Sequence, residues 1–274
     1  MILLIFCLTE QNNENNSNQD DIKQQITPFD AVLSLGAWCQ VGSVIKNKSL
    51  QLIESPFNNF GFQIWENVID ILKYRFKNYW NISNLYIGQP ITEHSCKYKD
   101  MRQIYQVYDS HYAGYSNHHF DVSDNSQTNL TTYTSFKTRQ KLLIDVFLKQ
   151  CQVMNYVCFV LKAMSTKTET QVSEKDLVRL YQILKYIRQD KPFQLRLSVP
   201  PLLYESTLEI IIKNNLLDIR LFTWTQQWNY DADSDEWKSM LQDIQLSSNH
   251  QQQIEQIIDI NNLPFSTVQL YLNS

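Results

Sequence analysis

Apolar residues follow two alternating patterns along most of this chain. Short apolar runs predict buried strands, and segments with apolar residues three or four positions apart predict amphipathic helices. The predicted strands lie in residues 30–39, 156–161, 193–197 and 219–223, and the predicted helices in residues 40–46, 63–79, 135–150, 174–188 and 203–214. Alternating strands and helices are typical of a parallel sheet with helices on its faces. We therefore predict an α/β fold with a mostly parallel, Rossmann-like sheet.

The first half of the chain departs from this alternation. Residues 54–61 contain a proline and a glycine that break regular elements, and residues 80–132 offer only two short strand candidates, 85–87 and 104–108. We expect an irregular, loop-rich insertion here. Loops on a rigid scaffold carry function more often than cores do.

The beginning of the chain differs in composition from the rest. Residues 1–8 are apolar but much shorter than the roughly 20 residues that span a bilayer, and residues 9–25 are polar and rich in Asn and Gln. Such a polar segment is typical of disorder. We predict a disordered or vestigial leader over residues 1–25, one α/β domain over residues 26–274 and a cytoplasmic location. A truncated signal segment at residues 1–8 is the alternative.

Charge and cysteine content narrow the class of protein. A net charge of −4 and an isoelectric point near 5.7 argue against a surface that binds nucleic acid. The hydrophobic fraction of 43% is that of a folded globular protein. Five scattered cysteines without a CxxC pair predict neither a disulfide framework nor a cysteine-rich zinc site.

Cys39 follows the first predicted strand and precedes the first predicted helix. Free N–H groups at a helix N-terminus favour a thiolate over a thiol, and Gly36 allows a sharp backbone turn just before. Ligands of α/β sheets bind at the carboxyl ends of the strands, where this thiol is expected. Cys39 is therefore a candidate nucleophile, with simple core packing as the alternative.

A reactive thiol needs a base and a third group that orients the base. Three of the five histidines, His111, His118 and His119, lie in residues 110–121. Asp121 or Asn117 is placed to hold an imidazole in one tautomer. The alternative is that these adjacent histidines are only exposed loop residues.

No metal or cofactor site is predicted. The histidine cluster matches no helical zinc motif. Asp231, Asp233 and Asp235 resemble the start of a calcium loop, but Glu236 occupies the position that needs glycine. We predict a solvated loop there, ahead of a helix at Trp237.

Several short motifs occur in the order found in a known family. They are residues 34–39 (Ser-Leu-Gly-Ala-Trp-Cys), residues 55–58 (Ser-Pro-Phe-Asn) and residues 118–120 (His-His-Phe). Over about residues 30–246 the chain resembles the family described as putative papain-like cysteine peptidases, whose members show Ser-Leu-Gly-x-x-Cys, Pro-Phe-Asp-Trp and His-Asp-Phe. The resemblance implies Cys39 as nucleophile and His118 as base.

Two positions depart from the family pattern. Asn58 replaces the Asp of Pro-Phe-Asp-Trp, and His119 replaces the Asp of His-Asp-Phe. Asn58 or Asp121 is the predicted orienting residue, since Asn serves this purpose in papain-like triads. The alternation of strands and helices differs from the papain layout, so the family's name rests more on a Cys–His pairing than on a shared fold.

These observations predict a cysteine-dependent hydrolase or acyl-transfer enzyme, similar to a peptidase, with a peptide, acyl or glycan substrate. The Cys39 thiolate would attack a carbonyl of that substrate. One alternative is a Rossmann-like transferase or a binding domain for a nucleotide or sugar, in which Cys39 only lines the crevice. Another is a catalytically silent interaction domain, because two acidic positions are lost. Neither a nucleic-acid partner nor a stable membrane span is expected.

Overall fold

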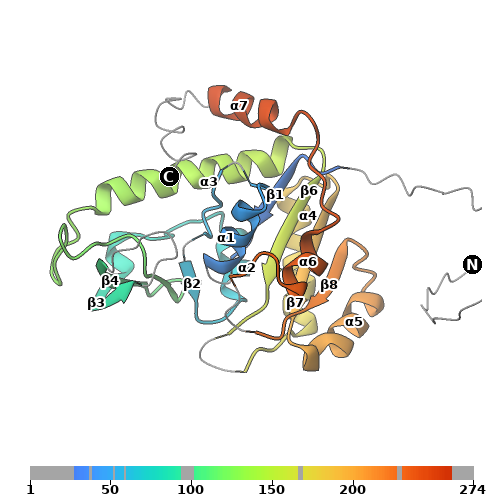
Figure 1. Cartoon of the computed structure of the whole chain (residues 1–274), viewed down its shortest axis with the longest axis horizontal. Coiled ribbons are helices and arrows are strands. Elements are labelled where there is room, and N and C mark those ends of the chain that lie inside the picture. Colours follow the sequence, from blue (N-terminus) through green and yellow to red (C-terminus); the bar gives the residue numbers. More distant parts are fainter. Residues whose placement is uncertain are drawn as a thin grey trace, which may run out of the picture.

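The computed structural model describes residues 28–36, 39–51, 53–58, 60–93, 102–165, 169–226 and 230–260. These residues form two sheets and the helices around them (Figure 1). The strands are β1 (Ala31–Ser34), β2 (Phe60–Phe62), β3 (Leu85–Glu93), β4 (Arg102–Asp109), β5 (Gly114–Ser116), β6 (Val157–Lys162), β7 (Phe193–Val199) and β8 (Ile219–Thr223). The α-helices are α1 (Cys39–Asn47), α2 (Asn67–Lys73), α3 (Tyr133–Val153), α4 (Glu174–Ile187), α5 (Tyr204–Lys213), α6 (Asp235–Leu241) and α7 (His250–Ile260). The predicted leader over residues 1–25 lies outside the described residues.

The first sheet is parallel, with the strand order β1-β6-β7-β8. Every residue of β6 is buried, from Val157 to Lys162. Parallel strands covered on both faces are mostly apolar, which is why β6 stands out in the sequence. Helix α4 connects β6 to β7, and α5 connects β7 to β8. The predicted α/β fold with a helix-covered parallel sheet is confirmed.

The predicted loop-rich insertion contains a second sheet. It is antiparallel, with the order β2-β5-β4-β3, and its main hairpin joins β3 to β4. The two short strand candidates lie within these longer strands, whereas β2 and β5 were not expected. Both missed strands are three residues long and contain a glycine, so they show no alternating pattern. The expectation of a mostly parallel sheet is therefore correct for the first sheet only.

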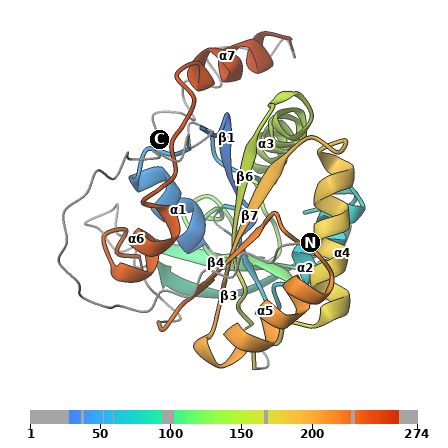
Figure 2. The same ribbon diagram turned by 90° about the vertical axis from the view of Figure 1, so that its right-hand side faces the viewer.

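Two hydrophobic cores lie on opposite faces of the parallel sheet. Val32 of β1 belongs to a core with Val41 of α1 and Trp237 of α6. Its neighbour Leu33 belongs to the larger core, which includes residues of α2, α3, α4 and the antiparallel sheet. Figure 2 shows α1 and α6 on one side of the sheet and α4 and α5 on the other.

Helix α2 is shorter than the helix predicted over residues 63–79. It ends at Lys73, and Arg75, Phe76 and Trp80 adopt positive φ angles of 49°, 60° and 51°. Such angles are unfavourable for residues other than glycine. Phe76 and Trp80 are nevertheless buried, at 5% and 0% exposure, so aromatic packing overrides the helical pattern.

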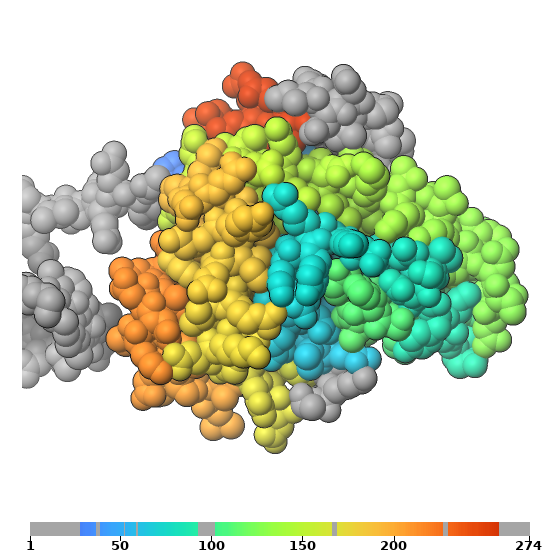
Figure 3. Space-filling model, turned by 180° about the vertical axis from the view of Figure 1, so that it is seen from behind, coloured from blue at the N-terminus to red at the C-terminus, as the bar shows by residue number. Residues whose placement is uncertain are grey.

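The insertion is attached to the parallel sheet through α4. Figure 3 shows the segment around α2 lying against α4 on the far face of the molecule. Arg179 Nη2 lies 3.1 Å from Asp70 Oδ1, and Trp65 Nε1 donates a hydrogen bond of 2.8 Å to the carbonyl of Gln171. These contacts hold the segment around α2 against α4 and the chain that leads into it.

Candidate functional site

Cys39 is the first residue of α1, which begins one position before the helix predicted over residues 40–46. The preceding strand β1 ends at Ser34, and Gly36 then adopts a φ of 82°, which glycine tolerates and other residues rarely do. A Cβ at position 36 would also lie 3.1 Å from Cβ of Phe57. Gly36 is therefore required both for the turn and for the close approach of the segment that carries Phe57.

Two of the family motifs hold each other in place. Ser55 Oγ donates a hydrogen bond of 2.6 Å to the carbonyl of Ser34, and Ser34 Oγ accepts one of 3.1 Å from the Gly36 amide. The Phe57 amide donates to Ser55 Oγ at 3.3 Å. All of these groups are buried. The serines of Ser-Leu-Gly and Ser-Pro-Phe thus set the chain direction just before Cys39.

The Cys39 thiol contacts a tyrosine from the far end of the chain. Cys39 Sγ lies 3.1 Å from Tyr230 Oη, and either atom can be the donor. Cys39 is half-buried, and Tyr230 is 39% exposed. The thiol is therefore within reach of a dissolved reactant and has one defined polar partner.

A second tyrosine lies near the thiol. Tyr115 of β5 covers Gly61 of β2, where a Cβ would come within 2.4 Å of its ring. Burial raises the pKa of the Tyr115 hydroxyl, and the charges of Cys39 and Tyr108 raise that pKa further. Tyr115 is therefore a neutral phenol at physiological pH, near enough to sense a charge on Cys39.

Asn58 supports the helix that carries Cys39. Its side chain lies against Gly42, which is one turn beyond Cys39 on the same side of α1. Asn58 Nδ2 donates a hydrogen bond of 3.1 Å to Gln51 Oε1. Asn58 is only 6% exposed, and its Oδ1 has no hydrogen-bond partner among the described residues. A buried acceptor of this kind is uncommon and is often found at functional sites.

His118 is held through its backbone. Arg102 Nη2 donates a hydrogen bond of 2.8 Å to the His118 carbonyl, and the His118 amide lies 3.5 Å from Ser116 Oγ. The residue is half-buried. Among the contacts of the described residues, none joins its imidazole to Cys39 Sγ. The assignment of His118 as base therefore stays a prediction.

His119 has a different environment from its neighbour. Its Nδ1 lies 2.7 Å from Ser116 Oγ, and its ring stacks on Phe60 with centroids 5.1 Å apart. Burial lowers the pKa of His119 well below its usual value, and the charges of Arg139 and His118 lower it further. His119 is a neutral packing residue in the aromatic core, at the position where the family pattern has an Asp.

Asp121 closes the turn after the histidines. Its Oδ1 accepts hydrogen bonds of 2.8 Å from both the amide and the hydroxyl of Ser123, and these bonds lower its carboxyl pKa. Its Oδ2 lies 3.9 Å from Arg102 Nη1, the guanidinium that also binds the His118 carbonyl. Asp121 thus contacts the histidine segment through Arg102, and direct orientation of an imidazole stays a prediction.

Sequence reasoning missed Tyr230, the tyrosine that contacts Cys39. Tyr230 lies 191 positions from Cys39, within a segment predicted only as a solvated loop. Its position between Trp224 and Trp237, in an otherwise acidic segment, was the only available signal. Asp233 of that segment pairs with Lys48 of the turn after α1 at 2.6 Å, so the carboxylate has a protein partner.

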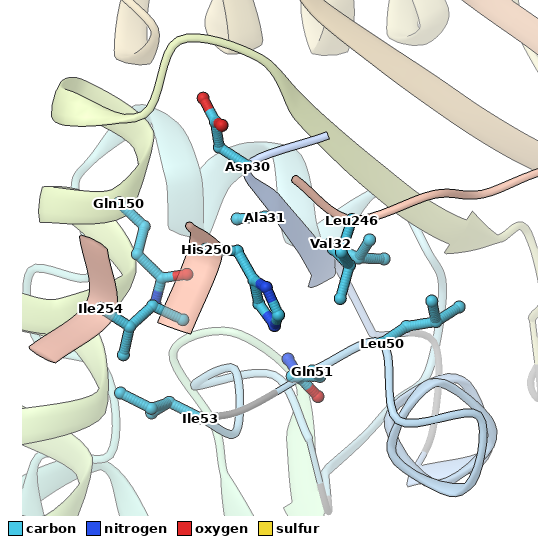
Figure 4. Close-up of a pocket in the computed structure, with 10 residues that line it drawn as sticks. All are labelled: Asp30, Ala31, Val32, Leu50, Gln51, Ile53, Gln150, Leu246, His250 and Ile254. Carbon is cyan, nitrogen blue, oxygen red and sulfur yellow. The ribbon is translucent and has the colours of Figure 1, made fainter. Parts of the chain in front are cut away.

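Two further features of the described residues bear on ligand binding, and neither offers a site for a substrate. No group of three or more His, Cys, Asp or Glu residues suited to a metal occurs in the part of the chain that is described. A pocket lined by Asp30, Gln51 and His250 lies near the start of β1, the opposite end from Cys39 (Figure 4). Its volume of about 10 Å³ is room for one water molecule and not for a substrate.

A membrane-spanning helix is also absent from the described residues, because none combines sufficient length with sufficient apolar character. Comparison with curated proteins and with solved structures finds no match. A family model described as putative papain-like cysteine peptidase matches residues 30–198. This region is more than half of the 274-residue chain and contains Cys39, Asn58, His118 and Asp121. The chain therefore belongs to the family of putative papain-like cysteine peptidases.

Proposed function

We propose that this protein is a cysteine-dependent hydrolase or acyl-transfer enzyme with Cys39 as its nucleophile. The observation that carries the proposal is the position of Cys39, half-buried at the first residue of α1 and just past the carboxyl end of β1. At this position the unpaired amides and the dipole of the helix stabilise a thiolate. The family match supports a peptide or related acyl compound as the substrate class.

The proposed reaction begins with transfer of the Cys39 proton to the imidazole of His118. The thiolate then forms a C–S bond to the substrate carbonyl, and the C=O electron pair moves to the oxygen, which accepts hydrogen bonds from amides at the start of α1. The leaving group departs with the proton held by His118. Water, or another nucleophile in acyl transfer, cleaves the resulting thioester and restores the Cys39 thiol.

His118 is the better candidate for the base of the two adjacent histidines. His119 is engaged with Ser116 and packed among aromatic rings, and its lowered pKa makes it a poor proton acceptor at neutral pH. The contacts of Asp121 favour it as the group that orders the His118 segment. The contacts of Asn58 favour a role on the Cys39 side, through Gly42.

A Rossmann-like binding or transferase domain is the second candidate. The four-stranded parallel sheet supports it, because nucleotides and sugars bind at the carboxyl ends of such strands. In that case Cys39 would line a crevice without reacting, and ligand binding would survive Cys39→Ala.

An acylation experiment separates the two candidates. The parent chain carries Cys7→Ser and Cys96→Ser, which removes the two cysteines outside the described residues. It is mixed with p-nitrophenyl acetate, the burst of p-nitrophenolate is recorded, and the acetylated peptide is identified by mass spectrometry. We expect an acetyl group on the Cys39 peptide and loss of the burst in Cys39→Ala, but not in the matched control Ser43→Ala on the same helix. Equal bursts in the parent and in Cys39→Ala would overturn the proposal.

A further inference from the structure

We infer that Tyr230 stabilises the Cys39 thiolate by donating its hydroxyl hydrogen to the sulfur, an inference that rests on the proposed role of Cys39 as nucleophile. Cys39 Sγ and Tyr230 Oη are 3.1 Å apart, which is within hydrogen-bond distance for sulfur. Tyr230 lies beyond the family-matched residues 30–198. The group that contacts the nucleophile therefore comes from a part of the chain that the family model does not cover.

The segment that carries Tyr230 is fixed on both sides. On one side, Lys162 Nζ donates a hydrogen bond of 2.8 Å to the carbonyl of Gln226. On the other side, the same ammonium lies 3.0 Å from Glu236 Oε1 in α6. The Lys162 side chain is fully buried at the carboxyl end of β6, so one internal cation holds the segment before and after Tyr230.

A further contact joins this segment directly to the end of α1. Lys48 is one residue past the end of α1, and Asp233 is three residues after Tyr230. Lys48 Nζ lies 2.6 Å from Asp233 Oδ1. Helix α6 also packs on α1 through the core that contains Trp237 and Val41. Tyr230 thus lies in the loop before α6, and both that loop and α6 are joined to the helix that carries Cys39.

This arrangement is what a positioned thiolate requires. A buried ion pair adds little net stability because desolvation offsets its attraction, so the Lys162–Glu236 pair is better explained by positioning. A neutral phenol that donates to an anionic sulfur favours the charged form over the thiol. The hydrogen bond leaves the O–H bond of Tyr230 intact, so the tyrosine acts before the attack and is not consumed by it.

Such a donor also fits the departures from the family pattern. Both acidic positions of the family motifs are replaced here, by Asn58 and His119, and His119 is neutral. Fewer carboxylates are therefore available to raise the basicity of the His118 imidazole. The rate of attack by Cys39 then depends more on the fraction of the thiol that is already a thiolate. Tyr230 would supply that larger thiolate fraction by stabilising the thiolate, whereas a stronger base would act by removing the proton from the thiol.

The test is the pH dependence of Cys39 alkylation by iodoacetamide in the full-length parent with Cys7→Ser and Cys96→Ser. Peptide mapping by mass spectrometry counts modification at Cys39 alone. Burial raises the pKa of Cys151 and of Cys158 to about 12, so these two thiols stay unreactive while the chain is folded and report any unfolding. Tyr230→Phe removes only the hydroxyl, and Tyr186→Phe, at a site that is 69% exposed, is the matched control.

We expect Tyr230→Phe to raise the apparent pKa of Cys39 and to slow its alkylation at about pH 7 by about threefold to tenfold. Tyr186→Phe should leave the profile unchanged. An unchanged profile in a folded Tyr230→Phe variant would overturn the inference. If modification of Cys151 or Cys158 shows that Tyr230→Phe unfolds, Asp233→Asn is used instead. This variant removes the ion pair with Lys48 and so loosens the segment that carries Tyr230, while the chain keeps the Tyr230 hydroxyl. An unaltered alkylation profile in Asp233→Asn counts against the inference.

The outcome is separable from that of the acylation experiment. A Cys39 profile that depends on Tyr230 but shows no acetylation would retain the inference and reject the hydrolase. Acetylation of Cys39 together with an alkylation profile that does not depend on Tyr230 would retain the hydrolase and reject the inference about Tyr230.

Discussion

The buried amide of Asn58 lies against Gly42, so that a Cβ at position 42 would come within 2.3 Å of Asn58 Oδ1. We expect Gly42→Ala to destabilise the protein, because overpacking a core site costs about 1–3 kcal/mol, which outweighs the roughly 1 kcal/mol that Ala gains over Gly in a helix. Urea unfolding measures the difference. Adding Asn58→Ala should restore most of the loss, and a second variant, Ser43→Ala, should be nearly neutral. Stabilisation by Gly42→Ala alone would show that Asn58 moves aside freely.

Removal of the His118 imidazole should impair acylation. Because a positioned general base contributes about 100-fold or more to such reactions, His118→Ala should reduce the burst rate with p-nitrophenyl acetate by at least about 100-fold. Added imidazole should restore part of the rate. The exposed His111→Ala serves as control. A burst rate in His118→Ala equal to that of the parent would remove His118 from the mechanism.

His119, which is packed among aromatic rings, predicts a loss of stability in mild acid. Its pKa is lower in the folded chain than in the unfolded chain, so the unfolded chain binds more protons. The contribution of His119 to the free energy of unfolding is therefore complete above the unfolded pKa of about 6.5 and is lost as the pH falls below it. Unfolding curves from about pH 7 to about pH 5 should show a smaller decline for His119→Phe than for the parent. A parallel decline in both would exclude His119 as the source, and the exposed His111→Gln should follow the parent.

Breaking the Lys162–Glu236 pair should be costly. Glu236→Gln leaves the fully buried ammonium of Lys162 without its carboxylate, and loss of one partner from a buried pair costs about 3–5 kcal/mol. Asp235→Asn, at the exposed neighbouring position, is the matched control and should change stability little. Denaturant titration measures both. A Glu236→Gln variant as stable as Asp235→Asn would mean that the carbonyl of Gln226 alone satisfies Lys162.

The Ser34–Ser55 contact predicts a structural role for the family serines. Ser55→Ala removes a hydroxyl that donates to the Ser34 carbonyl and accepts from the Phe57 amide, and leaves both buried groups without this partner. We expect a loss of about 1–3 kcal/mol by urea unfolding. The exposed Ser206→Ala is the control. A neutral Ser55→Ala would show that the turn before Cys39 is held by Gly36 and Phe57 alone.

The fold could be predicted from the sequence where the strands are buried on both faces. The strand β6 is almost entirely apolar and fully buried, and β1 is buried throughout, so both are clear in the sequence. The antiparallel sheet could not be predicted in the same way, because one of its faces carries tyrosines such as Tyr86, which is 52% exposed, rather than aliphatic residues. The helix predicted over residues 63–79 was too long, because aromatic burial holds Phe76 and Trp80 in left-handed conformations.

The candidate site could be predicted only as far as local sequence determines it. The place of Cys39 at the start of a helix follows from neighbouring residues. The different contacts of His118 and His119 do not, because the aromatic packing of His119 depends on partners such as Phe60 and Phe136 elsewhere in the chain. The contact of Tyr230 with Cys39 joins two distant positions without a shared pattern, so only the three-dimensional structure reveals it.

The smaller core determines which fragment of this chain can be studied in isolation. Val32 and Val41, which flank the turn to Cys39, share that core with Trp237 and Met240 of α6. An excised fragment that ends at residue 198, where the family match stops, would keep every residue of the family motifs and yet lose α6. Its nucleophile would then sit beside an apolar surface open to water, and such a fragment would aggregate before its chemistry could be assayed.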